Sequence, residues 1–118
     1  MGTRLPAHAT AVGKILLAYA PDDVQEAALK SLTRVTPYTI TNPTTFRRQL
    51  ARARSEGYAT TSEEMSLGAC SVAVPIMKNG EAIAAVGLVV RSLKRDRGRL
   101  VASLRTAAEG ISRSLAGG

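Results

Sequence analysis

Few residues in this chain have the type and spacing that catalysis requires. His8 is the only histidine and Cys70 the only cysteine among the 118 residues. A catalytic histidine needs a partner within hydrogen-bond reach, but no carboxylate lies within six residues of His8. We expect His8 to anchor a loop and Cys70, among alternating apolar residues, to act as a small hydrophobe. The sequence therefore predicts no catalytic residues and a protein that is not an enzyme.

Two further motifs resemble sites but lack a necessary part. Glu63 and Glu64 are adjacent, and neighbouring side chains on an extended segment point in opposite directions. They are therefore expected to face solvent or a partner rather than to act as an acid/base couple. Gly13-Lys14 resembles the end of a phosphate-binding loop, but His8 stands where that motif needs glycine. A single cysteine excludes an internal disulfide and a multi-cysteine zinc site, so we expect no metal and no cofactor.

Small side chains gather on two segments and form the remaining candidate site. The set is Ala11, Val12 and Gly13 on the first segment, and Ala69, Ser71, Ala73, Ala85, Gly87 and Val89 on the second. Small residues on a sheet face can leave room for a ligand. They can equally allow a helix to pack closely on the sheet, and both interpretations stay open at this point.

Composition places the chain among single globular domains. Hydrophobic residues make up 45% of it and aromatic residues 3%, so its core must be built from Ala, Val, Leu and Ile. We find no apolar run long enough for a membrane helix and no secretory signal. The sequence therefore predicts a cytoplasmic protein without a membrane partner.

The net charge of +7 raises the alternative of a nucleic-acid or acidic partner. The basic residues fall into two groups, Arg47, Arg48, Arg52 and Arg54, and then Arg91, Lys94, Arg95, Arg97 and Arg99. Neither group is interleaved with the aromatic residues on which bases stack. We expect solvated helix faces and helix starts, with a phosphate or acidic-partner surface as the alternative.

The elements that must position the candidate site are predicted from periodicity and helix-end signals. Helices are expected from Thr10 as N-cap to residue 19, from Pro21, from Asn42-Pro43 to Gly57, and over residues 94–115. Extended pieces are expected at residues 4–8 and 36–41, and strands at residues 58–61, 69–77 and 81–90. The result is an α+β domain with an antiparallel sheet. Gly13 inside the first helix indicates close approach of another group.

Asn79-Gly80 predicts a hairpin between the last two strands. We expect a three-residue loop, residues 78–80, with Gly80 left-handed. Ser71 then lies opposite Gly87, Ala73 opposite Ala85, and Ala69 opposite Val89. One face collects these small residues and the other a core surface of Cys70, Val72, Val74, Ile76, Ala82, Ala84, Val86 and Leu88.

Four motifs in register resemble the effector-binding domain of IclR-type bacterial transcription regulators. They are LPAHATAVGK with LLA, TPYTITNP, GYA, and EE ahead of SVAVPI, between about Arg4 and Leu115. The resemblance implies a GAF-like antiparallel sheet flanked by helices, in a domain that senses ligands and oligomerises. Residues 4–117 would be the C-terminal part of that domain, lacking its N-terminal strands, with residues 1–3 as start residues. DNA would be contacted by a winged helix-turn-helix domain that is not in this chain.

The same resemblance implies a ligand pocket at six positions: Ala11, Val12, Thr61, Ser71, Gly87 and Val89. Many family members have aspartate at the position of Thr61 and small polar residues at those of Gly87 and Val89. This less polar pocket favours an aromatic or extended organic acid, with backbone N–H groups of residues 10–13 meeting its carboxylate.

The predicted function is therefore a small-acid sensor that forms a homo-oligomer, a dimer or a tetramer. The alternative is a basic interaction module that contacts nucleic acid or an acidic protein partner. Binding to phosphates weakens steeply with salt, whereas apolar ligand binding hardly changes, so salt separates the two.

Overall fold

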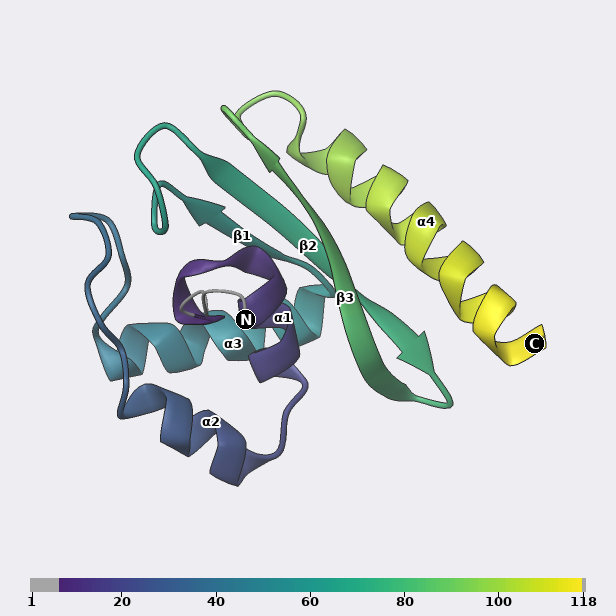
Figure 1. Cartoon of the computed structure of the whole chain (residues 1–118), viewed down its shortest axis with the longest axis horizontal. Coiled ribbons are helices and arrows are strands. Elements are labelled where there is room, and N and C mark those ends of the chain that lie inside the picture. The colour runs from purple at the N-terminus through teal and green to yellow at the C-terminus, as the bar shows by residue number, and fades with distance from the viewer. Residues whose placement is uncertain (1–6, 118) are drawn as a thin grey trace, which may run out of the picture.

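A three-stranded antiparallel sheet, in the order β1-β2-β3, lies between helices on both of its faces (Figure 1). The structure is a computed structural model that describes residues 7–117. Its elements are η1 (Ala7–Ala9), α1 (Ala11–Ala18), α2 (Asp22–Leu29), α3 (Pro43–Glu56), β1 (Ala59–Ser62), β2 (Cys70–Lys78), β3 (Glu81–Val90) and α4 (Arg97–Gly117). The predicted α+β class with an antiparallel sheet is confirmed.

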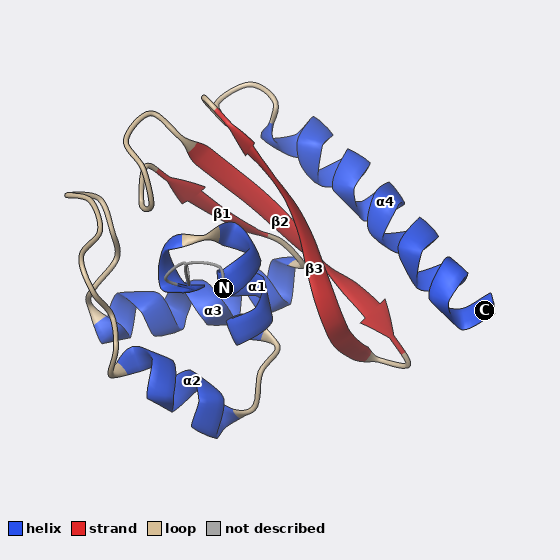
Figure 2. Cartoon of the chain, in the orientation of Figure 1, coloured by secondary structure: helices blue, strands red, loops and turns tan. Residues whose placement is uncertain are grey.

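Two separate cores cover the two faces of the sheet. On one face α1 and α3 pack around Ile15, Phe46, Leu50, Ala59 and Ala73. On the other face α4 runs along the sheet, as Figure 2 shows, and packs Val101, Leu104 and Ala108 against Val72, Val74 and Ile76. Strand β2 serves both cores because its successive side chains point to opposite faces.

The predicted helix starts at Thr10 and Asn42 are confirmed by their capping bonds. Thr10 Oγ1 accepts a hydrogen bond from the Gly13 amide at 2.9 Å, and Asn42 Oδ1 accepts one from the Thr45 amide at 3.0 Å. Helix α3 ends at Gly57, whose φ of 78° is left-handed. Pro21 occupies the N-cap of α2 rather than its first helical position. These side chains fix where α1 and α3 begin beneath the sheet.

The two extended pieces that we predicted are wrong where the structure describes them. Residues 7–9 form a 3-10 turn, and residues 4–6 of that prediction, like the predicted domain start, lie outside the described residues. Residues 36–38 are a bend and a turn instead of an extended piece, and residues 39–41 have no regular secondary structure. Their backbone bonds to a side chain, because Thr39 Oγ1 accepts from the amides of Val35 and Thr36 at 3.1 and 2.8 Å. Helix α4 begins at Arg97, three residues later than predicted.

The hairpin has a two-residue loop, so the predicted three-residue loop is wrong. Lys78 pairs with Glu81, and both Asn79 (φ 53°) and Gly80 (φ 80°) are left-handed, as in a type I′ turn. Asparagine tolerates this conformation, and the turn matches the twist of the strands.

A two-residue loop alone would turn the side chains of β3 to the opposite faces of the sheet. A bulge next to the turn restores the predicted faces. Ile76 pairs with Ala84 but Met77 with Ala82, which leaves Ile83 unpaired. Ser71 consequently lies opposite Val89 and Ala73 opposite Gly87, so the predicted pairings are wrong by two residues. A shift of two preserves the face of each side chain. Ser71, Gly87 and Val89 share a face as predicted, whereas Ala82 leaves the predicted core surface.

Candidate functional site

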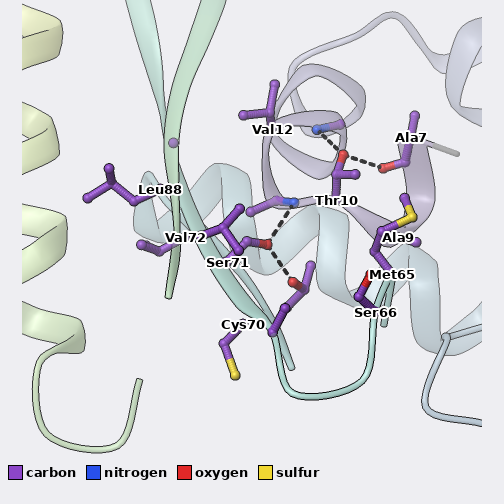
Figure 3. Close-up of a pocket in the computed structure, with 16 residues that line it drawn as sticks. Ala7, Ala9, Thr10, Val12, Met65, Ser66, Cys70, Ser71, Val72 and Leu88 are labelled. Carbon is purple, nitrogen blue, oxygen red and sulfur yellow. Dashed lines mark hydrogen bonds between the residues drawn. The ribbon is translucent and has the colours of Figure 1, made fainter. Parts of the chain in front are cut away.

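A cavity of about 550 Å³ lies between α1 and the sheet (Figure 3). Its walls come from four parts of the chain: η1 and the start of α1, β1, the segment after β1, and the β2–β3 hairpin. The structure brings all six sequence-predicted site residues to this cavity, namely Ala11, Val12, Thr61, Ser71, Gly87 and Val89. Sequence reasoning missed Met65 and Ser66, which also line it.

Hydroxyl groups supply the polar part of a lining that is otherwise mostly apolar. Ser71 Oγ accepts a hydrogen bond from the Ala11 amide at 3.3 Å and is also hydrogen-bonded to Thr61 Oγ1, as the dashed lines in Figure 3 show. These bonds tie β1 and β2 to the first turn of α1. They hold the two hydroxyls at fixed positions in the cavity wall.

The first turn of α1 presents backbone amides to the same cavity. The first amides of any α-helix have no acceptor within the helix. The Ala11 amide donates to Ser71 Oγ, and the Gly13 amide donates to Thr10 Oγ1. The Lys14 amide donates to the Thr10 carbonyl oxygen. Among the hydrogen bonds found within residues 7–117, none has the Val12 amide as its donor. This N–H, at the positive end of a helix dipole, is available to an anionic group.

Gly87 shows that cavity formation and close packing occur together. A Cβ atom there would lie 2.8 Å from the Val72 carbonyl oxygen and 3.1 Å from Cγ2 of Val12. A side chain at this position would therefore meet the backbone of β2 first and the Val12 side chain of α1 next. The small residues serve both roles that the sequence left open: some permit contact between layers, and others leave the cavity beside that contact.

A buried ion pair lies beside the cavity, and the sequence did not predict it. Lys14 Nζ is 2.6 Å from Glu64 Oε1, with the two side chains only 2% and 8% exposed, and 2.8 Å from Gln49 Oε1. Burial lowers the pKa of Lys14, while the Glu64 carboxylate acts in the opposite direction.

The expectation that Glu64 faces solvent or a partner is wrong. Glu63 has a left-handed φ of 56°, so the extended alternation of side chains stops there and Glu64 points inward. A signal was present in the sequence. Lys14 lies within an apolar helix, and a buried lysine requires a carboxylate partner.

The other two candidate residues from the sequence, His8 and Cys70, make contacts that hold the fold together. His8 Nε2 lies 2.6 Å from the Thr33 carbonyl oxygen, so His8 anchors a loop as expected. Cys70 is buried, and its Sγ lies 3.8 Å from both Ser62 Oγ and the Arg91 carbonyl oxygen. Within residues 7–117 no three His, Cys, Asp or Glu side chains are grouped so as to hold a metal ion. No helix of that part is long and apolar enough to span a membrane.

The basic residues of the two predicted groups are exposed, as expected of solvated faces. Four of them, Arg91, Lys94, Arg95 and Arg97, line a second, polar hollow of about 690 Å³ at the start of α4. Ser62, Ser92 and the carboxylate-bearing Glu63 line it too. This hollow is separate from the apolar cavity but shares Thr61 and Cys70 with it.

Comparison with known proteins gives consistent matches. A family model described as bacterial transcriptional regulator IclR C-terminal matches residues 1–113. The p-hydroxybenzoate hydroxylase transcriptional activator of Acinetobacter baylyi is 43% identical over 95 residues, covering 79% of this chain and 33% of the activator. The chain spans 33–49% of the length of the curated relatives that it matches first.

Two solved structures are similar in both sequence and fold. An IclR homolog complexed with 4-hydroxybenzoate, from Microbacterium hydrocarbonoxydans, has a TM-score of 0.91 and 39% identity, covering 98% of this chain and 48% of the homolog. The inducer-binding domain of a PobR double mutant from Acinetobacter, in complex with 3-hydroxybenzoic acid, has a TM-score of 0.86 and 34% identity. That alignment covers 95% of this chain and 68% of the domain.

Proposed function

This chain belongs to the family of bacterial transcriptional regulator IclR C-terminal domains, and on that basis we propose that it is the ligand-sensing part of such a regulator. Residues 4–117 would form part of an effector-binding domain that captures a small organic acid in the cavity under α1. A winged helix-turn-helix domain outside this chain would contact DNA in the cytoplasm. The family's members are transcriptional regulators rather than enzymes.

The observation that carries this proposal is the cavity itself. Its volume of about 550 Å³ lies within the range of small-molecule sites, roughly 300–1,000 Å³. Its lining is mostly apolar, with the hydroxyls of Thr61 and Ser71 in the wall and bonded to the first turn of α1 through the Ala11 amide. An aromatic ring matches the apolar wall, and a carboxylate matches the helix amide. The two similar structures with hydroxybenzoates support an aromatic acid.

The test measures binding of 4-hydroxybenzoate, 3-hydroxybenzoate and aliphatic acids, with calorimetry and thermal unfolding as the two methods. A ligand that binds only the folded state stabilises it by about 2.7 kcal/mol at one hundred times its Kd. We expect stabilisation by at least one aromatic acid. Binding should change little between low and high salt, because apolar burial is insensitive to ionic strength.

A cavity-blocking variant and a matched control make this test specific. In Gly87→Leu the new Cβ would lie 2.8 Å from the Val72 carbonyl oxygen and 3.1 Å from Val12 Cγ2, so the side chain should fill the cavity and abolish binding, at a stability cost at the upper end of about 1–3 kcal/mol. Gly110→Leu makes the same change on α4, where nothing lies within 4 Å, and should leave binding intact. Undiminished binding by folded Gly87→Leu would remove this cavity from the proposal.

The second candidate function rests on the basic hollow at the start of α4. Its four cations favour phosphate groups or an acidic protein surface. Salt-sensitive binding of duplex DNA, lost on Arg95→Gln and Arg97→Gln, together with no response to any acid, would favour this candidate. Sequence-specific binding is not expected, since the basic residues lie on separate elements.

We also propose that the chain forms a homo-oligomer. Strand β3 lies at an edge of the sheet, where unpaired N–H and C=O groups can accept another strand. Ile83 and Val89 on this strand are 46% and 75% exposed. Light scattering at high protein concentration should give the mass of a dimer or a tetramer, and a uniform monomer would contradict this prediction.

A further inference from the structure

Two walls of the cavity are adjacent in sequence to the two partners of the buried ion pair. Gly13, which lines the cavity from α1, directly precedes Lys14. Met65 and Ser66, which line it from the segment between β1 and β2 (Figure 3), directly follow Glu64. The ion pair therefore spans from one wall to the other behind the lining.

The segment of residues 63–69 is fastened to the rest of the chain at only a few places. Thr36 Oγ1 donates to the Glu63 carbonyl at 2.5 Å, and Thr39 Oγ1 donates to the Glu64 carbonyl at 2.6 Å. These bonds tie it to the turn before α3. Among the described residues, the Lys14–Glu64 pair is the one hydrogen bond or ion pair found between this segment and α1.

The chemistry of this contact indicates a role in geometry more than in stability. Burying two charges costs desolvation energy, so an apolar pair of similar volume is often as stable or more stable. What an apolar pair lacks is direction. A charge-assisted bond of 2.6 Å fixes its partners closely, and Gln49 Oε1 holds the ammonium from a second side at 2.8 Å.

We propose that Lys14 and Glu64 are positioning residues for the ligand cavity, resting on the function proposed above. The pair holds the Met65–Ser66 wall at a fixed distance from α1 before any ligand enters. A ligand then contacts two walls that are already ordered, and binding avoids the entropy loss of ordering them. Neither side chain lines the cavity, so both act through the backbone beside them.

The experiment replaces the pair without leaving a buried charge. Lys14→Met/Glu64→Leu removes both charges and keeps similar volume. The matched control is Arg47→Met/Glu26→Leu, which removes an exposed pair, 59% and 52% exposed, that also joins two elements. Both folded variants are compared with the whole unaltered chain by calorimetry with 4-hydroxybenzoate and, without ligand, by hydrogen exchange at the amides of residues 63–69.

We expect the affinity of the buried-pair variant for 4-hydroxybenzoate to fall about tenfold, from the ordering of two wall residues. Its amides at Glu63, Gly68 and Ala69, which are hydrogen-bonded within the segment, should exchange about tenfold faster, while the control matches the unaltered chain in both. Unchanged exchange and affinity in the folded buried-pair variant would overturn the inference. If the variant does not fold, Glu64→Asp, which keeps the charge but withdraws the carboxylate, must show the same two changes.

The two proposals fail in distinguishable ways. If the unaltered chain binds no organic acid, the proposed function fails, and hydrogen exchange still decides whether the pair orders the wall. If the unaltered chain binds and the buried-pair variant binds equally well, the cavity is a ligand site but Lys14 and Glu64 do not position it.

Discussion

Gly13→Ala is expected to destabilise the protein, although alanine is normally favoured over glycine in a helix by about 1 kcal/mol. A Cβ at position 13 would lie 2.1 Å from the Ala7 carbonyl oxygen and 2.6 Å from the Ala7 Cα. The chain of η1 crosses the first turn of α1 at this point, so the obstacle is backbone and cannot rotate away. We expect a loss at the upper end of the roughly 1–3 kcal/mol that overpacking costs.

Urea unfolding measures this effect, and α4 offers the control. Gly110 lies within that helix with nothing within 4 Å of its missing Cβ, so Gly110→Ala should stabilise the protein by up to about 1 kcal/mol. The same substitution is thus expected to have opposite signs at the two positions. A Gly13→Ala protein as stable as the unaltered chain would mean that Ala7 does not lie against α1.

Lys14→Met alone is expected to cost about 3–5 kcal/mol, because it leaves the Glu64 carboxylate buried without its cation. The Thr39 bond holds the Glu64 backbone in place, which opposes rotation of the carboxylate into solvent. The free energy of unfolding at neutral pH is the measurement. Adding Glu64→Leu to this variant should restore most of the loss, since no charge then remains in the core.

The exposed pair within α3 is the control for burial. Arg52 and Glu56 lie 3.0 Å apart, with side chains 79% and 39% exposed. Such i,i+4 surface pairs contribute about 0.3–0.5 kcal/mol. Arg52→Met should therefore change stability by a small fraction of the effect of Lys14→Met. Equal effects of the two substitutions would show that the Lys14–Glu64 pair is not buried as described.

The starts of α1 and α3 could be predicted from the sequence because their causes are local. Thr10 and Asn42 bond to amides three residues ahead, and Gly57 ends α3 through its own φ. The faces of two strand residues were predictable for a related reason. Alternation along a strand is a local property, so Ser71 and Gly87 were assigned to the correct face even though their pairing was wrong.

Features set by contacts between distant segments could not be predicted. The turn at residues 36–39 is stabilised by threonine bonds, including those to the carbonyls of Glu63 and Glu64, more than twenty residues away. The inward direction of Glu64 follows from a single left-handed residue before it. The wall residues Met65 and Ser66 lie in the same irregular segment, which has no periodicity from which burial could be inferred.

The bulge at Ile83 also bears on how the length of this hairpin can change during evolution. A two-residue turn alone would exchange the faces of β3, and the one unpaired residue restores them. A deletion in the strand itself, at Ile83, would give a regular ladder running directly into the Asn79-Gly80 turn. Ala84 would then follow Ala82 directly and still pair with Ile76, so the residues nearer the cavity would keep both their partners and their faces. Loss of Ile83 would therefore leave the cavity wall as it is, whereas loss of a paired residue of β3 would turn the residues beyond it to the opposite face.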